Sequence, residues 1–148
     1  MPQSLHQVYG HIVFSIKDRE NTITGDIEQK LYAYLGGIIR DLKGAPVLIN
    51  GMPDHVHLLV RASKSITDID FMRQLKGSSS KWLNENGLNG FRWQSGYGWF
   101  SVSAKDLPAA RAYVEKQKEH HQEMTFKEEF RKFLTQYQVV YDERYVWD

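Results

Sequence analysis

Apolar and polar positions repeat with two different periods along the chain, which predicts a mixture of strands and helices. Segments rich in β-branched, aromatic and other apolar residues, with alternation or turn residues at their ends, predict strands at 8–16, 46–50, 55–61 and 97–103. Apolar residues at helical spacing predict helices over about 24–44, 65–86, 107–123 and 126–137. Thr24, Ser65 and Asp106 stand where helix caps are expected.

The order of these elements, β-α-β-β-α-β-α-α, is informative about the fold. Its first six elements match the split βαβ plan, in which a four-stranded antiparallel sheet carries two helices on one face. We therefore predict an α+β fold of the ferredoxin-like or RRM-like type, with further helices at the C-terminal end. The 148 residues contain no repeat or linker, so we expect a single domain over 1–148.

Composition excludes several kinds of chemistry. The chain has no cysteine, so it has neither disulfides nor thiolate metal ligands nor a cysteine nucleophile. No apolar run approaches the roughly 18 residues that a membrane span requires. The N-terminal sequence MPQSLHQVYG does not resemble a secretory signal, and we expect a cytoplasmic protein with no membrane contact.

The distribution of charge is more informative than the net charge of +1. Ten Lys/Arg and five Asp/Glu fall within 61–118, so this part carries +5 and the two flanks together carry −4. Tryptophan and tyrosine side chains at 82, 93, 97 and 99 are interleaved with these cations. Such a pattern suits a polyanion with bases that stack, and a solvated surface above ordinary core aromatics is the simpler alternative.

Two histidines stand one residue apart in the stretch NGMPDHVHLLV, residues 50–60. Because side chains alternate on a strand, His55 and His57 share one face, while the apolar Val56, Leu58 and Val60 share the other and are expected to pack on the helices. The histidine face is then predicted to be the free side of the sheet. Imidazoles about 7 Å apart at Cα can converge on one divalent ion. Surface or hydrogen-bonded histidines without a ligand are the alternative, and Asp54 is a candidate partner that orients an imidazole.

A tyrosine and a glutamine are separated by one helical turn in the predicted helix 107–123. Tyr113 and Gln117 are i and i+4 neighbours, so they share one face of that helix. An amide oxygen is a usable ligand for a hard cation, and the phenol beside it reaches whatever the cation polarises. A half-buried core tyrosine is the simpler interpretation of Tyr113. His120 and His121 extend the same helix and offer a further ligand, or simply a solvated helix end.

These motifs, in this order, resemble those of the single-tyrosine (Y1) HUH transposases of the IS200/IS605 type. His55-Val56-His57 corresponds to the histidine–hydrophobic–histidine motif, and Tyr113 to Gln117 corresponds to Y-x-x-x-Q. The resemblance also covers HIVFSIKDR, LKGSSSKW, WQSGYGWFSVS and the closing TFKEEFRKFL…YDERYVWD, so it spans essentially the whole chain.

The resemblance implies a function and a set of residue roles. His55, His57 and Gln117 would hold Mg²⁺ or Mn²⁺, and Tyr113 would attack the scissile phosphate to give a 5′-phosphotyrosine and a free 3′-OH. The implied substrate is single-stranded DNA with imperfect hairpins at the ends of an insertion sequence, and the implied assembly is a homodimer. No residue in the sequence is an obvious general base for Tyr113.

Basic and hydroxyl side chains provide candidates for DNA contacts. Ammonium, guanidinium and hydroxyl groups suit phosphates, and the candidates are Lys17, Arg19, Arg73, Lys76, Ser80 and Lys81. A plain surface role is the alternative for each of them.

Three other functions remain open from the sequence. One is a non-catalytic nucleic-acid-binding module, because an RRM-like fold by itself implies no chemistry. Another is a metal-dependent hydrolase that uses water as its nucleophile. The third is a domesticated, REP-associated tyrosine nuclease of the same family, which cleaves host hairpins without moving an element.

Overall fold

Four strands form one antiparallel sheet in the computed structural model, which describes residues 2–120 and 123–148. The strands are β1 (Tyr9–Ser15), β2 (Ala45–Met52), β3 (His55–Arg61) and β4 (Gly98–Val102), in the spatial order β2-β3-β1-β4. Every neighbouring pair is antiparallel. The predicted ferredoxin-like sheet is therefore confirmed, and each strand lies within two residues of its predicted bounds.

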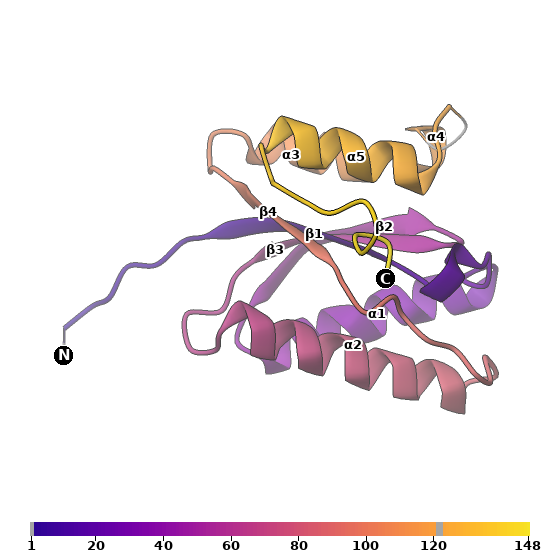
Figure 1. Ribbon diagram of the computed structural model, residues 1–148. Helices are drawn as coiled ribbons and strands as arrows, with labels where there is room; N and C mark the ends of the chain where they lie inside the picture. The colour runs from indigo at the N-terminus through magenta and orange to yellow at the C-terminus, as the bar shows by residue number, and fades with distance from the viewer. Residues whose placement is uncertain (1, 121–122) are drawn as a thin grey trace.

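Helices cover both faces of this sheet (Figure 1). They are α1 (Asp26–Asp41), α2 (Asp68–Glu85), α3 (Leu107–Glu115), α4 (Gln117–His120) and α5 (Phe126–Gln136), and a short 3₁₀ turn, η1 (Lys17–Arg19), follows β1. Helices α1 and α2 lie on one face, while α3, α4 and α5 lie on the other. Within the described residues, no helix combines the length and the apolarity that a membrane crossing requires.

The main core lies between the sheet and the pair α1 and α2. Val56, Leu58 and Val60 of β3 are fully buried in it, as their alternation predicted. The serine-rich stretch of α2 does not interrupt the helix. Its buried Ser79 hydroxyl donates to the Leu75 carbonyl (2.7 Å) and accepts from the Trp93 indole (2.9 Å). The cap predicted at Ser65 is wrong. The helix begins later, and the hydroxyl at position 67 accepts from the Asp70 amide (3.2 Å).

The second face of the sheet is not free, which corrects the prediction from the alternating pattern. A second apolar cluster forms where α5 packs on β1 and β4, and it consists of Val13, Phe100, Phe126, Phe130, Phe133 and Leu134. The last helix was predicted as an element, but nothing in the pattern placed it on this face. As a result, the side chains of His55 and His57 have no exposed surface.

A glycine in β4 sets how closely α5 approaches the sheet. A Cβ atom added at Gly98 would lie 2.5 Å from the ring of Phe130, which is closer than real Cβ contacts come. Because Gly98 has no side chain, Phe130 packs directly on the strand. The glycine therefore holds α5 at the distance at which its buried residues reach β1 and β3.

The single helix predicted over 107–123 is also wrong in its extent. Helix α3 ends at Glu115, and α4 begins at Gln117. The side-chain amide of Asn50 on β2 donates to the carbonyl oxygens of Val114 (2.9 Å) and Glu115 (3.3 Å), so these carbonyls are satisfied at the end of α3. Residues 121 and 122 of the predicted helix lie outside the described residues.

Candidate active site

Two buried imidazoles lie side by side on β3, facing α3 and α5. Each ring is held through its Nδ1 atom. Nδ1 of His55 contacts the carboxylate of Asp54 at 2.6 Å, and Nδ1 of His57 contacts Nε2 of His11 on β1 at 2.7 Å. The Nε2 atoms of both rings are thereby directed at the same point, the carboxylate of Glu129. A carboxylate at the second ring nitrogen, as Asp54 provides for His55, is typical of metal-ligating histidines.

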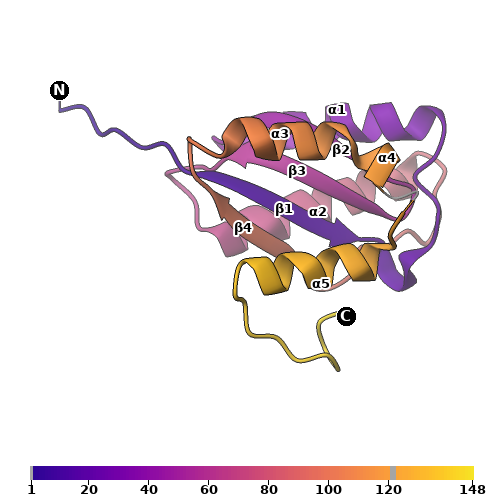
Figure 2. The same cartoon turned by 90° about the horizontal axis from the view of Figure 1, so that it is seen from above.

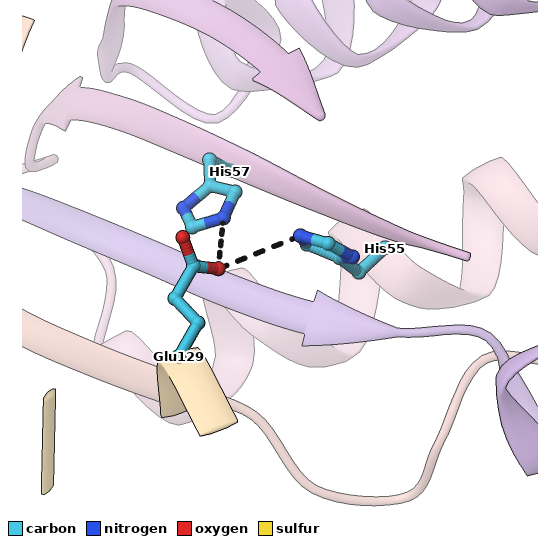
Figure 3. A group of neighbouring side chains, drawn as sticks. All are labelled: His55, His57 and Glu129. Carbon is cyan, nitrogen blue, oxygen red and sulfur yellow. Dashed lines mark hydrogen bonds and ion pairs between the residues drawn. The ribbon is translucent and has the colours of Figure 1, made fainter. Parts of the chain in front are cut away.

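Glu129 of α5 is the centre of the cluster. Its Oε1 atom lies 2.9 Å from Nε2 of His57 and 3.5 Å from Nε2 of His55, as Figure 3 shows. The carboxylate is 1% exposed. A buried carboxylate is costly unless it is paired, and here two imidazoles lie against the same oxygen. The three side chains form a group whose ligand atoms all lie within 4.8 Å of one another.

The other oxygen of the same carboxylate faces the tyrosine and the glutamine. The Tyr113 hydroxyl donates to Oε2 of Glu129, and the Gln117 amide nitrogen lies 3.3 Å from that atom. Tyr113 belongs to α3 and Gln117 to α4, and both side chains reach the same carboxylate. The sequence predicted that Tyr113 and Gln117 share one face of a single helix. In the structure they belong to two helices, and both contact Glu129.

The donor set fits a divalent cation. The side-chain oxygen of Gln117 is buried and has no hydrogen-bond partner within the described part of the chain. Two imidazoles, a carboxylate and an amide oxygen are ligands that Mn²⁺ accepts, and the oxygens also suit Mg²⁺. His121 lies outside the described residues, and so does the side chain of His120.

Burial and neighbouring charges set the protonation states around the cluster. Burial, with a further contribution from His57, lowers the pKa of His11 to about 3, so this imidazole is neutral. Burial alone would lower the pKa of His55, but its contacts with Asp54 and Glu129 raise it overall. Burial and the hydrogen bond to Glu129 raise the pKa of Tyr113. The phenol is therefore protonated at neutral pH, and it needs a proton acceptor to become a nucleophile.

Two residues of the cluster, His11 and Glu129, did not emerge from the sequence. A weak signal existed for His11, because a lone histidine in the apolar run YGHIVFS stands out. Glu129 gave no signal at all. It is one of two adjacent glutamates in a charged helix, and only its position on the buried face of α5 distinguishes it from Glu128.

The candidate DNA contacts are not gathered near this cluster. Arg73, Lys76, Ser80 and Lys81 all belong to α2, which lies across the sheet from α3 and α5 (Figure 1). Arg73 and Lys81 are exposed, and Arg73 pairs with Asp70 at 3.3 Å. Lys17 and Arg19 form η1, where the Arg19 guanidinium donates to the Trp147 carbonyl (3.2 Å). The Ser80 hydroxyl donates to the Phe91 carbonyl (3.3 Å).

Lys76 has a structural role that the sequence did not reveal. Its ammonium group donates to three backbone carbonyls of the loop before β4, those of Gln94 (2.5 Å), Ser95 (3.0 Å) and Gly96 (2.9 Å). Burial lowers the pKa of Lys76 to about 8. Since an ammonium group has three donors, all of them are used here, and Lys76 holds this loop on α2.

We expect Lys76→Met to lower the free energy of unfolding by about 1–3 kcal/mol, because three carbonyls lose a charged donor. The matched control is Lys81→Met on the same helix, which is exposed and should change stability by less than about 0.5 kcal/mol. Urea denaturation of both variants measures the difference. Equal stability of the two variants would show that the three hydrogen bonds contribute nothing, and Lys76 would return as a candidate phosphate contact.

The sheet topology, the His55-x-His57 strand and the helix that carries Tyr113 together define the architecture of the single-tyrosine HUH transposases. The family model described as "Transposase IS200 like" matches residues 4–117. The chain therefore belongs to the IS200-like transposase family. The matched region includes both strand histidines, Tyr113 and Gln117, while Glu129 lies beyond it.

Individual relatives agree with this assignment. The ISDra2 transposase TnpA of Deinococcus radiodurans is 28% identical over 120 residues, which cover 76% of this chain and 86% of the relative. The crystal structure of a putative transposase from D. radiodurans R1 has a TM-score of 0.64 at 24% identity and covers 79% of this chain and 98% of that one. The structure of a REP-associated tyrosine transposase bound to a REP hairpin has a TM-score of 0.62 at 15% identity, with coverage of 82% and 72%. The two structures show that the fold is shared.

Proposed function

We propose that this chain is a metal-dependent transposase that cleaves and rejoins single-stranded DNA at hairpin-bearing ends of an insertion sequence. The observation that carries the proposal is the buried carboxylate of Glu129, which contacts the Tyr113 hydroxyl through one oxygen and both strand imidazoles through the other. A nucleophile and a set of metal ligands are thus in contact within one chain. The hairpin-bound structure of the REP-associated relative supports hairpin DNA as the substrate class.

Four side chains would hold the metal in this proposal: His55, His57, Gln117 and Glu129. When bound, Mg²⁺ or Mn²⁺ polarises a non-bridging oxygen of the scissile phosphate and stabilises the charge that builds there. His11 fixes the orientation of the His57 ring, and Asp54 that of the His55 ring, in each case through the Nδ1 atom of the ring. The aromatic side chains of α5 keep water away from the cluster, since Phe126 lies against His55 and Phe133 against His11.

The covalent step would be carried by Tyr113. Its hydroxyl oxygen forms a bond to phosphorus, the bond from phosphorus to the 3′ oxygen breaks, and that oxygen takes a proton from solvent to become a free 3′-OH. The phenol proton passes to Oε2 of Glu129, which already accepts its hydrogen bond. The 5′-phosphotyrosine retains the energy of the phosphodiester, so a second 3′-OH can reverse the step and join a new strand.

We propose that the chain assembles as a homodimer, which is what the resemblance of its sequence motifs to the family implies. Within the single chain, Tyr113 lies against the histidines of its own sheet, with 6.2 Å between its ring centre and that of His57. The chain thus contains every group of the proposed site. A domesticated, REP-associated nuclease would use the same residues, and the presence or absence of matching hairpins beside the gene separates that role from element transposition.

The proposal is tested by isolating the covalent intermediate. The wild-type chain is incubated with Mn²⁺ and a library of 3′-labelled single-stranded hairpins with randomised flanks, and the products are separated on a denaturing gel. We expect label to move with the protein and, after trypsin, to reside on the peptide 112–116, in which Tyr113 is the only tyrosine. EDTA should abolish the adduct, and fully duplex DNA should give none. An adduct on another peptide, an adduct that persists in EDTA, or no adduct would contradict the proposal.

A further inference from the structure

A cavity of about 520 Å³ opens between α3 and α5, next to Tyr113. Figure 2 shows the two helices along opposite sides of the sheet face, with β1 and β3 between them. His11 and Tyr113 line the inner part of the cavity, and Ala109 and Ala110 form its α3 wall. Because these two α3 residues are alanines, space remains that larger side chains would fill. The metal-ligand cluster does not account for this space.

The wall contributed by α5 is aromatic. Phe133 and Tyr137 both line the cavity, and both rings stack on Phe100 of β4, with 5.5 Å and 4.9 Å between ring centres. Their orientations are therefore fixed by the core of the second sheet face. Rigid aromatic surfaces of this kind stack well on planar bases, because every base has a π-face.

Four polar side chains stand at the exposed part of the lining. They are Ser101 on β4, Asp106 at the start of α3, and Lys132 and Gln136 on α5, and all four are solvent-exposed. A lysine ammonium group suits a phosphate, whereas a carboxylate accepts hydrogen bonds from the amino groups of bases. A glutamine amide both donates and accepts, as adenine requires. The lining thus combines stacking surfaces, one phosphate partner and two groups that read base edges.

We propose that this cavity binds the nucleotide next to the scissile phosphate, and that it selects a base with an exocyclic amino group. The inference rests on the proposed function, because it assumes that Tyr113, which lines the cavity, attacks the scissile phosphate. The volume lies within the roughly 300–1,000 Å³ of small-molecule sites. Thymine has no amino group for Asp106, so it is the base that the site disfavours.

The test uses the wild-type chain and three mononucleotides as probes, namely dAMP, dCMP and dTMP. Backbone amide NMR signals are followed during each titration. We expect dAMP or dCMP to shift signals from 106–110 and 132–137, with a dissociation constant at least about fivefold lower than that of dTMP. Shifts confined to other residues, or equal affinity for all three nucleotides, would overturn the inference.

Two variants separate the cavity from the surrounding surface. Ala110→Leu fills the cavity and should abolish these shifts, whereas Ala112→Leu lies on the exposed side of the same helix and should leave them intact. Lys132→Ala should weaken binding of whichever of dAMP and dCMP binds the wild-type chain more tightly at least about fivefold, and it tests the site without adding bulk to the core. Binding that survives both Ala110→Leu and Lys132→Ala would contradict the assignment.

The inference and the proposed function fail in distinguishable ways. If the wild-type chain forms the Mn²⁺-dependent adduct but the mononucleotides do not shift the cavity signals, the cavity is not a nucleotide site and the proposed function stands. If the nucleotides bind the cavity but no adduct forms, the proposed chemistry is wrong. In that case the cavity still recognises a nucleotide, although its assignment to the nucleotide next to a scissile phosphate is overturned.

Discussion

Tyr113→Phe is expected to reduce formation of the covalent protein–DNA adduct by at least about 1,000-fold, since the variant lacks the only atom that attacks phosphorus in the proposed mechanism. The affinity for hairpin DNA should stay within about twofold, because the ring and its contacts with Phe133 remain. Adduct formation is measured on denaturing gels at saturating Mn²⁺, and affinity is measured by fluorescence anisotropy in the same buffer.

The matched control is Tyr145→Phe, which changes a tyrosine that is 62% exposed and should leave adduct formation unchanged. The rival functions give different results. A hydrolase with a water nucleophile keeps cleaving after Tyr113→Phe but stops after His55→Ala. A non-catalytic binding module forms no adduct even with the wild-type tyrosine. An adduct of equal yield in Tyr113→Phe would exclude Tyr113 as the nucleophile.

Glu129→Gln is expected to weaken the affinity for Mn²⁺ on the order of 10- to 100-fold. The substitution keeps the shape of the side chain but removes the negative charge, and a neutral amide oxygen is a weaker ligand for a divalent cation than a carboxylate oxygen. Isothermal titration calorimetry measures the metal affinity directly, with no DNA present. The rate of adduct formation at saturating Mn²⁺ should fall as well, by at least about 100-fold, because the amide is a poor acceptor for the Tyr113 proton.

The neighbouring Glu128→Gln is the control for this experiment. Glu128 is exposed, its carboxylate accepts a hydrogen bond from the Thr125 hydroxyl (3.2 Å), and metal affinity should not change. Glu129 has two proposed roles, as a metal ligand and as the acceptor of the Tyr113 proton. The measurements of metal affinity and of reaction rate separate them. Unchanged metal affinity with a slow reaction would leave Glu129 as a proton acceptor alone. Unchanged affinity together with an unchanged rate would remove it from the site.

Much of the fold could be predicted from the sequence because local patterns determine it. The alternation in 55–61 placed Val56, Leu58 and Val60 in the core, and the element order alone indicated the sheet topology. The same alternation placed His55 and His57 together on the opposite face. It did not show that this face is covered, since period-two patterning describes one strand and carries no information about which helix packs above it.

The candidate site was only partly predictable for the same reason. His55 and His57 are close in sequence, and Tyr113 and Gln117 have a recognisable spacing. Glu129, in contrast, lies 72 positions from His57 in the sequence. Lys76 was predicted only as a DNA contact, because a cluster of cations in the sequence does not show which cation also holds a neighbouring loop. Contacts of this kind depend on the packing of whole elements, and no local pattern encodes them.

The absence of a side chain at Gly98 has a consequence for the chemistry as well as for packing. Phe130 follows Glu129 directly in α5, so the contact between Phe130 and the strand determines how far the carboxylate stands above the imidazoles. Because residue 98 is a glycine, the ring of Phe130 lies directly on the backbone of β4. We expect even an alanine there to displace the ring of Phe130, and with it α5 and Glu129, so the geometry of the proposed catalytic cluster depends on a residue outside that cluster.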